Sequence, residues 1–273
     1  ESPQERRVQL QDPISVRGNI SSDGTMILLR EEGWKEVKLA TCSQVETLSA
    51  KDKRRRPAQQ KGKRAHEDVV RLSAHSYCAG LWNADTFELY QYAEGLRRGL
   101  DQLEQLSSVN DGAPWIERTT QTNFPEAIQV IDWGHVVERL WAVAHAVYGE
   151  EPAAQEWEDQ QEDALWEGEV EAVITALEAL ELDQSDYPDE VRQAPGYFRH
   201  NRARMRYDVF RALGCPIGSG TVESGAGNVV KHRMRRPGRG WKREWAQSML
   251  AVLSELHSNR FEQAWEMAYH PAA

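Results

Sequence analysis

An alternation of apolar and polar side chains over residues 34–42 constrains the fold of this chain more than any other feature of its sequence. A period of two residues is typical of a β-strand with one buried face. An apolar run at 25–29 precedes it, and a Glu-Glu-Gly turn at 31–33 joins the two stretches. We therefore predict strands across residues 17–48, paired as a long hairpin with an extension or as a three-stranded meander.

The signals that follow alternate between helix and strand. Residues 85–103 have apolar side chains at helical spacing and begin with an Asp that can cap the helix. Short runs at 105–110 and 127–131 predict two further strands, and strand, helix and strand in this order favour a mixed α/β sheet with parallel members. From 136 to 212 the apolar spacing is helical, and helices are also predicted after Gly220 and from Trp241.

The composition of the chain limits the classes of protein to which it can belong. The longest apolar runs span only a few residues, too short for a transmembrane helix. Three cysteines, far apart in the sequence, exclude a disulfide scaffold and indicate a reducing compartment. The 273 residues, 40% of them hydrophobic, are enough for one large domain or two smaller ones. Since the chain begins with Glu rather than Met, we expect it to be a piece of a longer protein.

The net charge of −10 conceals a strong separation of acidic and basic residues. Residues 150–190 hold sixteen acids and no Lys or Arg, whereas 199–243 hold twelve Lys or Arg and two acids. A second basic run, 51–64, holds eight Lys or Arg. Long blocks of one sign are typical of solvated faces, but a basic block beside an acidic one also suits a protein that handles DNA. Charge alone leaves both interpretations open.

Three acidic residues stand where strand or helix ends would expose them: Asp23, Asp111 and Glu223. Phosphoryl transfer by two divalent metals needs several carboxylates that converge from different elements, and acids far apart in the sequence suit that need. Each acid also has a simpler interpretation. Asp23 and Asp111 each precede a Gly, and Asp-Gly is a common turn dipeptide. Glu223 lies near a helix start, where an acid is electrostatically favourable without any function.

Several longer strings accompany these acids. They are Asp111–Ile116, Phe124–Ala127, Val130–His135, Arg204–Tyr207, Gly214–Ser224, Val229–Met234 and Gly240–Trp241. With these strings, residues 17–268 resemble the catalytic region of a bacterial insertion-sequence transposase of the DDE type, specifically the ISKra group. The string Ile-Gly-Ser-Gly-x-x-Glu-Ser at 217–224 is the most specific part of the resemblance.

The resemblance implies an RNase H-like fold, which is an α/β mixed sheet flanked by helices, with a large all-helical insertion before the last catalytic acid. Residues 17–135 would form the first part of this core, with a basic loop at 51–66. The insertion would span 136–212, and 213–273 would supply the C-terminal helices of the core. Residues 1–16 would be an N-terminal remnant or linker.

The resemblance also implies a function. Asp23, Asp111 and Glu223 would be both the catalytic and the metal-binding residues, and would hold two Mg²⁺ or Mn²⁺ ions. The reaction would be hydrolysis of phosphodiesters at the ends of an insertion sequence, followed by strand transfer. The expected partners are transposon-end DNA, target DNA and further copies of the chain on that DNA, with no membrane. The expected location is the bacterial cytoplasm, in association with the nucleoid.

Further residues are assigned to the surroundings of this site. Asp132 could be a fourth acid or could orient His135 in a second shell, but we favour a helix cap and a packed histidine. Trp133 and Trp241 are candidates for stacking on bases, whereas Trp245, at helical spacing, is predicted to be core. Basic side chains that would bind DNA phosphates beside the cut are Lys231, Arg233, Arg235, Arg236, Arg239, Lys242, Arg243, Arg204 and Arg206.

Two other functions stay open on the sequence alone. A catalytically silent, transposase-derived fragment would bind DNA or a partner protein without metal-dependent cleavage. A related RNase H-like nuclease would cut DNA without joining a product. The intact set of three acids favours the active transposase over the silent fragment.

Overall fold

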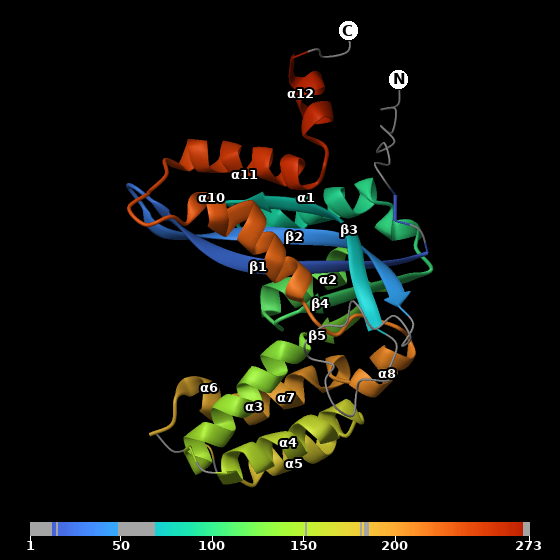
Figure 1. Cartoon of the computed structure of the whole chain (residues 1–273), viewed down its shortest axis with the longest axis vertical. Coiled ribbons are helices and arrows are strands. Elements are labelled where there is room, and N and C mark those ends of the chain that lie inside the picture. The colour runs from blue at the N-terminus through green and yellow to red at the C-terminus, as the bar shows by residue number, and fades with distance from the viewer. Residues whose placement is uncertain are drawn as a thin grey trace. The chain divides into compact units, whose positions relative to one another are not determined.

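A mixed sheet of five strands organises the fold (Figure 1). The computed structural model describes residues 13–14, 16–48, 69–150, 152–180, 182 and 186–269. Strands β1 (Arg17–Leu29), β2 (Gly33–Leu48) and β3 (Val69–Gly80) are consecutive and antiparallel, whereas β4 (Gln105–Asn110) is parallel to β1. With β5 (Ile128–Ile131), the strand order is β3-β2-β1-β4-β5. The predicted α/β class with a mixed, helix-flanked sheet is confirmed.

Residues 17–48 form a long hairpin, and the third antiparallel strand lies beyond them. This strand, β3, falls where no strand is predicted, because its pattern is broken by a bulge. The register of β2 against β3 shifts between Cys42 and Gln44, and Ala74 in the shifted part of β3 has a φ of +48°. An extra residue in one strand ends the strict period of two. The predicted basic loop at 51–66 lies outside the described residues, as does most of the predicted segment 1–16.

The predicted helix at 85–103 is shorter than expected. Helix α1 (Ala84–Arg97) begins after Asn83, whose side chain accepts the Thr86 N–H, so Asn83 rather than Asp85 is the cap. Gly99, with a φ of +70°, then ends the helix, and a short 3₁₀ turn, η3 (Leu100–Gln102), leads into β4. The strands predicted at 105–110 and 127–131 are confirmed, the second beginning at residue 128.

The chain divides into two compact units, and each is described here by itself. The first contains residues 1–108, 113–128 and 220–273, and the second contains 109–112 and 129–219. Besides α1, the helices of the first unit are α2 (Pro114–Asn123), α9 (Gly220–Gly225), the π-helical segment η5 (Ala226–Lys231), α10 (His232–Met234), α11 (Arg243–His257) and α12 (Phe261–Tyr269). No helix among the residues that the structure describes is long and apolar enough to cross a membrane.

Alternation along the strands of the first unit sends side chains to two different cores. Ile27 and Leu29 of β1 pack with Val222 of α9 and Leu250 of α11. Ile20, an even-numbered residue of the same strand, belongs instead to a cluster with side chains from η3, β4 and the end of α2. The sheet therefore has an apolar layer on each of its faces.

The second unit is built from helices around a core of its own. They are α3 (Trp133–Tyr148), α4 (Pro152–Trp166), α5 (Val170–Glu178), α6 (Asp189–Arg192), α7 (Ala194–Asn201), the 3₁₀ turn η4 (Arg202–Arg204) and α8 (Tyr207–Ala212). The Trp133 ring packs edge-on against Trp166 and Tyr207, with centroids 5.2 and 4.8 Å away. Trp133 is thus an interior side chain of this unit, where it is only 9% exposed.

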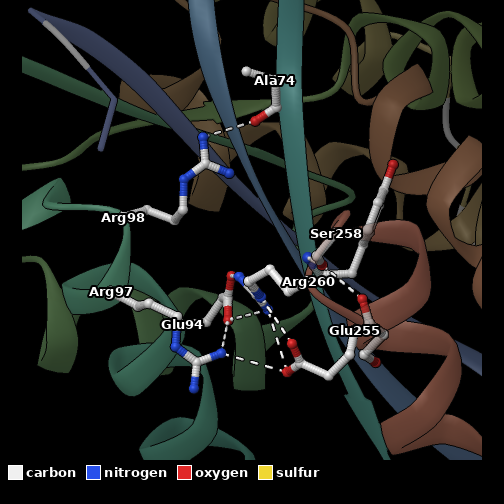
Figure 2. Close-up of polar contacts among 9 residues, drawn as sticks. Ala74, Glu94, Arg97, Arg98, Glu255, Ser258 and Arg260 are labelled. Carbon is white, nitrogen blue, oxygen red and sulfur yellow. Dashed lines mark hydrogen bonds and ion pairs between the residues drawn. The ribbon is translucent and has the colours of Figure 1, made fainter. Parts of the chain in front are cut away.

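Strand β3 forms one edge of the sheet, and side chains from α1 and α11 bond its outward backbone groups. The hydroxyl of Ser258, the residue after α11, accepts the Tyr77 N–H at 2.9 Å, and Arg98 donates to the Ala74 carbonyl at 2.8 Å (Figure 2). Backbone groups already bonded within the chain are a poor template for another strand. These contacts therefore protect the edge against pairing with a second molecule.

A buried ion pair joins α1 to the end of α11 beside this edge (Figure 2). Arg260 donates to both carboxylate oxygens of Glu94, at 2.7 and 3.0 Å, and the two side chains are only 5% and 3% exposed. Arg260 also donates to Glu255 at 2.8 Å, and Arg97 donates to Glu94 at 3.1 Å. Burial opposes the charged guanidinium, but the hydrogen bonds to Glu94 and Glu255 raise the pKa of Arg260 above its usual value. Arg260 therefore stays charged in the interior.

All three cysteines, Cys42, Cys78 and Cys215, are buried free thiols. Burial raises the pKa of Cys42 and of Cys78, because a thiolate is poorly solvated in the core. The thiols therefore act as small apolar side chains in this fold.

We expect the substitution Glu94→Gln to lower the free energy of unfolding by about 3–5 kcal/mol, because it leaves the buried charge of Arg260 with half of its compensation. Urea unfolding followed by circular dichroism measures the change. The control is Asp85→Asn, which breaks an exposed ion pair with Arg118 and should cost less than about 1 kcal/mol. Equal unfolding midpoints for the two variants would contradict the importance given to the buried pair.

Candidate functional site

Asp23 lies in the middle of a strand and not in a turn. It is paired opposite Leu39 of β2, and β1 continues for six residues beyond it. Its carboxylate accepts the Gly24 N–H at 2.7 Å, and the side chain is half-buried. As an odd-numbered residue of β1, Asp23 is on the sheet face that Ile27 and Leu29 share with α9.

Glu223 belongs to α9, which packs on this same sheet face of the first unit. Val222 is buried in the core with Ile27, whereas Glu223 is exposed. The close approach of the helix depends on Gly225, where a Cβ atom would lie 2.7 Å from the Tyr77 ring. Helix α9 then widens into the π-helical segment η5, a geometry that is frequent at functional sites. The first unit thus carries two of the three predicted acids on one face of the sheet.

Asp111 belongs to the second unit and directly follows β4. The Tyr197 hydroxyl donates to the Asp111 carbonyl at 3.1 Å, and the Asp111 side chain is half-buried. Gly112 has a φ of +89°, and a Cβ atom there would lie 3.0 Å from the Ile131 side chain. The turn interpretation therefore describes the backbone at Asp111, although it does not describe Asp23.

Asp132 follows β5, and its N–H donates to the Asn110 carbonyl at 2.8 Å, so the ends of β4 and β5 lie side by side. One oxygen of its carboxylate accepts the backbone N–H of His135 at 2.8 Å and lies 3.0 Å from His135 Nδ1. Asp132 is thus the cap of α3 and also orients His135. The favoured interpretation as a cap is confirmed, but the histidine is half-buried and ion-paired rather than packed in the core.

The second oxygen of Asp132 accepts the backbone N–H of Ser219. The Trp133 N–H also donates to the Ile217 carbonyl at 2.8 Å. The backbone at 217–219, within the most specific string of the sequence, is therefore held against the first turn of α3.

The charges around His135 keep its ring protonated. The hydrogen bond to Asp132, against the effect of burial, raises the pKa of His135 to about 9, and the charges of Asp132, Asp111 and Glu138 act in the same direction. Burial raises the pKa of Asp132, but the hydrogen bonds from His135 and Ser219 outweigh it and lower the pKa below the usual value.

Tyr197, a neighbour of Asp111, carries no sequence signal. Burial raises the pKa of Tyr197 to about 12, which keeps its hydroxyl protonated as a donor to the Asp111 carbonyl. The Arg139 guanidinium lies 4.1 Å from the centre of the Tyr197 ring. Tyr197 is 86 positions from Asp111, so no spacing could link them.

The predicted DNA-binding residues differ in their surroundings. In the second unit, Arg206 lies 3.4 Å from Asp208, and Arg204 donates to Asn201. In the first unit, the exposed cations are Lys231, Arg233, Arg235, Arg236, Arg239, Lys242 and Arg243. Arg243 makes a two-pronged ion pair with Glu32, at 2.8 and 2.6 Å, which anchors it to the tip of the β1–β2 hairpin.

Of the tryptophans near this basic stretch, Trp245 does not follow the prediction. Trp245 is 64% exposed, so its assignment to the core is wrong: helix α11 buries Ala246 and Leu250 and turns Trp245 outward. Trp241 is half-buried, and its indole N–H donates to the Met234 carbonyl at 3.1 Å.

No family model matches the chain, and no curated protein matches it.

The ion pair of His135 predicts a pH dependence of stability. Since the pKa of His135 in the fold, about 9, is above the usual value of about 6.5, the protonated ring stabilises the fold fully below about pH 6.5. This contribution is lost as the pH rises through about 9. Urea unfolding should therefore show a difference between wild type and His135→Gln that is largest near pH 6 and fades near pH 10. A ring titration midpoint near 6.5, measured by NMR, would refute the ion pair.

Proposed function

We propose that the chain is the catalytic core of a DDE-type DNA transposase with an RNase H-like fold. The strand order β3-β2-β1-β4-β5, with β1 antiparallel to β2 and parallel to β4, is compatible with that fold. The helices between Trp133 and Ala212 would be the insertion that separates Asp111 from Glu223.

The strand register is the observation that carries this proposal. Asn19 of β1 and Ser107 of β4 are the last paired residues of the two parallel strands. Counted along the chain from this pair, Asp23 within β1 and Asp111, the residue after β4, both lie four positions further on. This equal count supports a shared metal site for the two acids.

The three acids fit divalent cations in their chemistry. Carboxylate oxygens are the hard donors that Mg²⁺ prefers, and none of the three acids is fully buried. Asp23 and Asp111 would share the ligation of two Mg²⁺ or Mn²⁺ ions, and Glu223 would complete it. When bound, such ions activate the attacking oxygen and stabilise the leaving oxygen of a phosphodiester.

Other residues of the chain would position these ligands. The bond from Ser219 to Asp132 fixes the backbone four residues before Glu223 in the sequence. The hydrogen bond from Tyr197 to the Asp111 carbonyl fixes the turn that presents the Asp111 carboxylate. The protonated His135 adds positive charge near Asp111.

The reaction has two steps. In the first, a water oxygen attacks phosphorus at the end of the element, and the bond to the 3′-oxygen breaks, which leaves a 3′-hydroxyl and a 5′-phosphate. In the second, this 3′-hydroxyl attacks a phosphodiester of the target DNA in line, and the 3′-oxygen of the target strand departs. Neither step needs a covalent intermediate with the protein. The DNA would be held by the exposed cations of 231–243, in a homo-oligomer working in the bacterial cytoplasm.

We expect Asp111→Asn to reduce Mg²⁺-dependent nicking of insertion-sequence end DNA more than about 100-fold, because the loss of a metal ligand costs more than the loss of an outer contact. Urea unfolding and DNA retention in gels should be nearly unchanged. The control is Glu138→Gln on α3, which also removes a negative charge that acts on His135 but no proposed ligand.

The outcomes separate the proposed functions. Loss of nicking in Asp111→Asn but not in Glu138→Gln, with joined products in the wild type, supports the transposase. Metal-dependent nicking without joined products would indicate a nuclease. Metal-independent DNA binding without nicking would indicate a silent fragment, and equal nicking by Asp111→Asn and wild type would overturn the assignment of Asp111.

A further inference from the structure

A basic turn is fastened to the tip of the β1–β2 hairpin in the first unit. Residues 235–242, called here the strap, meet the end of β1 at Trp241, which forms a parallel bridge with Leu29. The Arg30 N–H donates to the Trp241 carbonyl, and the Trp241 N–H donates to the Leu28 carbonyl, both at 2.9 Å. The Arg30 guanidinium also donates to the Gly240 carbonyl at 2.7 Å. The strap is therefore bonded to the hairpin like a short additional strand.

The strap presents its cations from a fixed backbone. The Arg239 N–H donates to the Arg236 carbonyl at 3.2 Å, which closes a turn with a φ of +72° at Gly238. Arg235, Arg236 and Arg239 are all exposed, and no acid occurs between residues 231 and 243. A rigid turn with several guanidinium groups matches the geometry and the charge of phosphates.

Trp34 of β2 lies beside these cations on the hairpin. More than half of its side chain, 54%, is exposed, and the Arg235 guanidinium lies 5.7 Å from its ring centre. Trp34 is paired opposite Leu28, directly next to the residues that anchor the strap. An aromatic ring that is open to solvent and lies beside a guanidinium of a basic segment is an arrangement by which proteins bind unpaired nucleotides.

We propose that Trp34 stacks on an unpaired base of bound DNA while Arg235, Arg236 and Arg239 contact the neighbouring phosphates. Bases within a paired duplex are already stacked on both faces, so the ring would select DNA that is unpaired or distorted. The cations alone would bind any DNA. This inference rests on the proposed function, and it adds a preference for a local DNA structure to it.

The exposed Trp265 of α12 has different charged neighbours. It is 50% exposed, its ring centre lies 4.3 Å from that of Tyr269, and its helix carries Glu262 and Glu266. Acidic neighbours repel phosphates. Trp265 is therefore a control for Trp34, with nearly the same exposure and on a helix that carries acidic neighbours.

The test compares two DNA probes of the same sequence, one fully paired and one with a short unpaired tract, by fluorescence anisotropy with the full chain. Trp34→Ala should weaken binding to the unpaired probe about 5- to 100-fold, which corresponds to the loss of one stacked base. Binding to the paired probe should change less than about twofold. Trp34→Phe should restore most of the affinity, and Trp265→Ala should change neither probe.

The strap cations should behave differently from the ring. Arg236→Gln and Arg239→Gln should each weaken both probes and should each lower the salt dependence of binding by about one unit of slope. Urea unfolding of all variants verifies that they fold, and Trp34→Phe keeps the test valid should Trp34→Ala prove unstable.

The failure of this inference is distinct from that of the proposed function. If wild type binds both probes and Trp34→Ala binds them equally well, or loses affinity for both to the same extent, stacking by Trp34 is refuted and the DNA-binding function stands. If wild type binds neither probe at low salt, the proposed function and this inference both fall.

Discussion

The buried Glu94–Arg260 ion pair connects the two layers of the first unit. Helix α1 packs through Phe87 against Cys78 of β3, whereas α11 packs against Tyr77, the adjacent residue of the strand. Adjacent residues of a strand point to opposite faces, so the pair links the layers around the edge of β3. Neither charge is stable in the interior without the other, and therefore α1 and the end of α11 must be in place together. The sheet between them carries Asp23, α9 and the strap.

Asp132 in the second unit also joins segments that are far apart in the sequence. One carboxylate accepts hydrogen bonds from the start of α3 and from Ser219, which is 87 positions away. In both places the carboxylate oxygens of a buried acid accept hydrogen bonds from a segment far away in the sequence. Each acid therefore holds two distant segments together. The bond to Asp132 holds Ser219, which precedes the proposed ligand Glu223 by four positions in the sequence.

Periodic patterns in the sequence predict helices and strands, but contacts between residues far apart in the sequence leave no such pattern. The alternation at 34–42 identifies β2, and strand and helix signals identify β4, β5 and the helices beyond Asp132. Strand β3 escapes because a bulge at Ala74 interrupts its period. Trp245 is assigned to the wrong face because helical spacing marks a stripe without saying which side of the helix is covered. Glu94 and Arg260 are 166 positions apart, so no local pattern could pair them. Trp34 becomes a candidate for base stacking only in the folded structure, where Arg235 of the strap lies beside its ring.

The burial of the cysteines has a practical consequence for spectroscopy. Alkylating reagents attack the thiolate, and Cys42 and Cys78 hold their protons firmly inside the core, as Cys215 is also enclosed. A cysteine introduced on the surface, at Ala251 in the first unit or Ala179 in the second, would then be the preferred target of a maleimide dye. Each unit can in this way carry its own fluorescent or paramagnetic reporter while the native thiols remain in their packing positions.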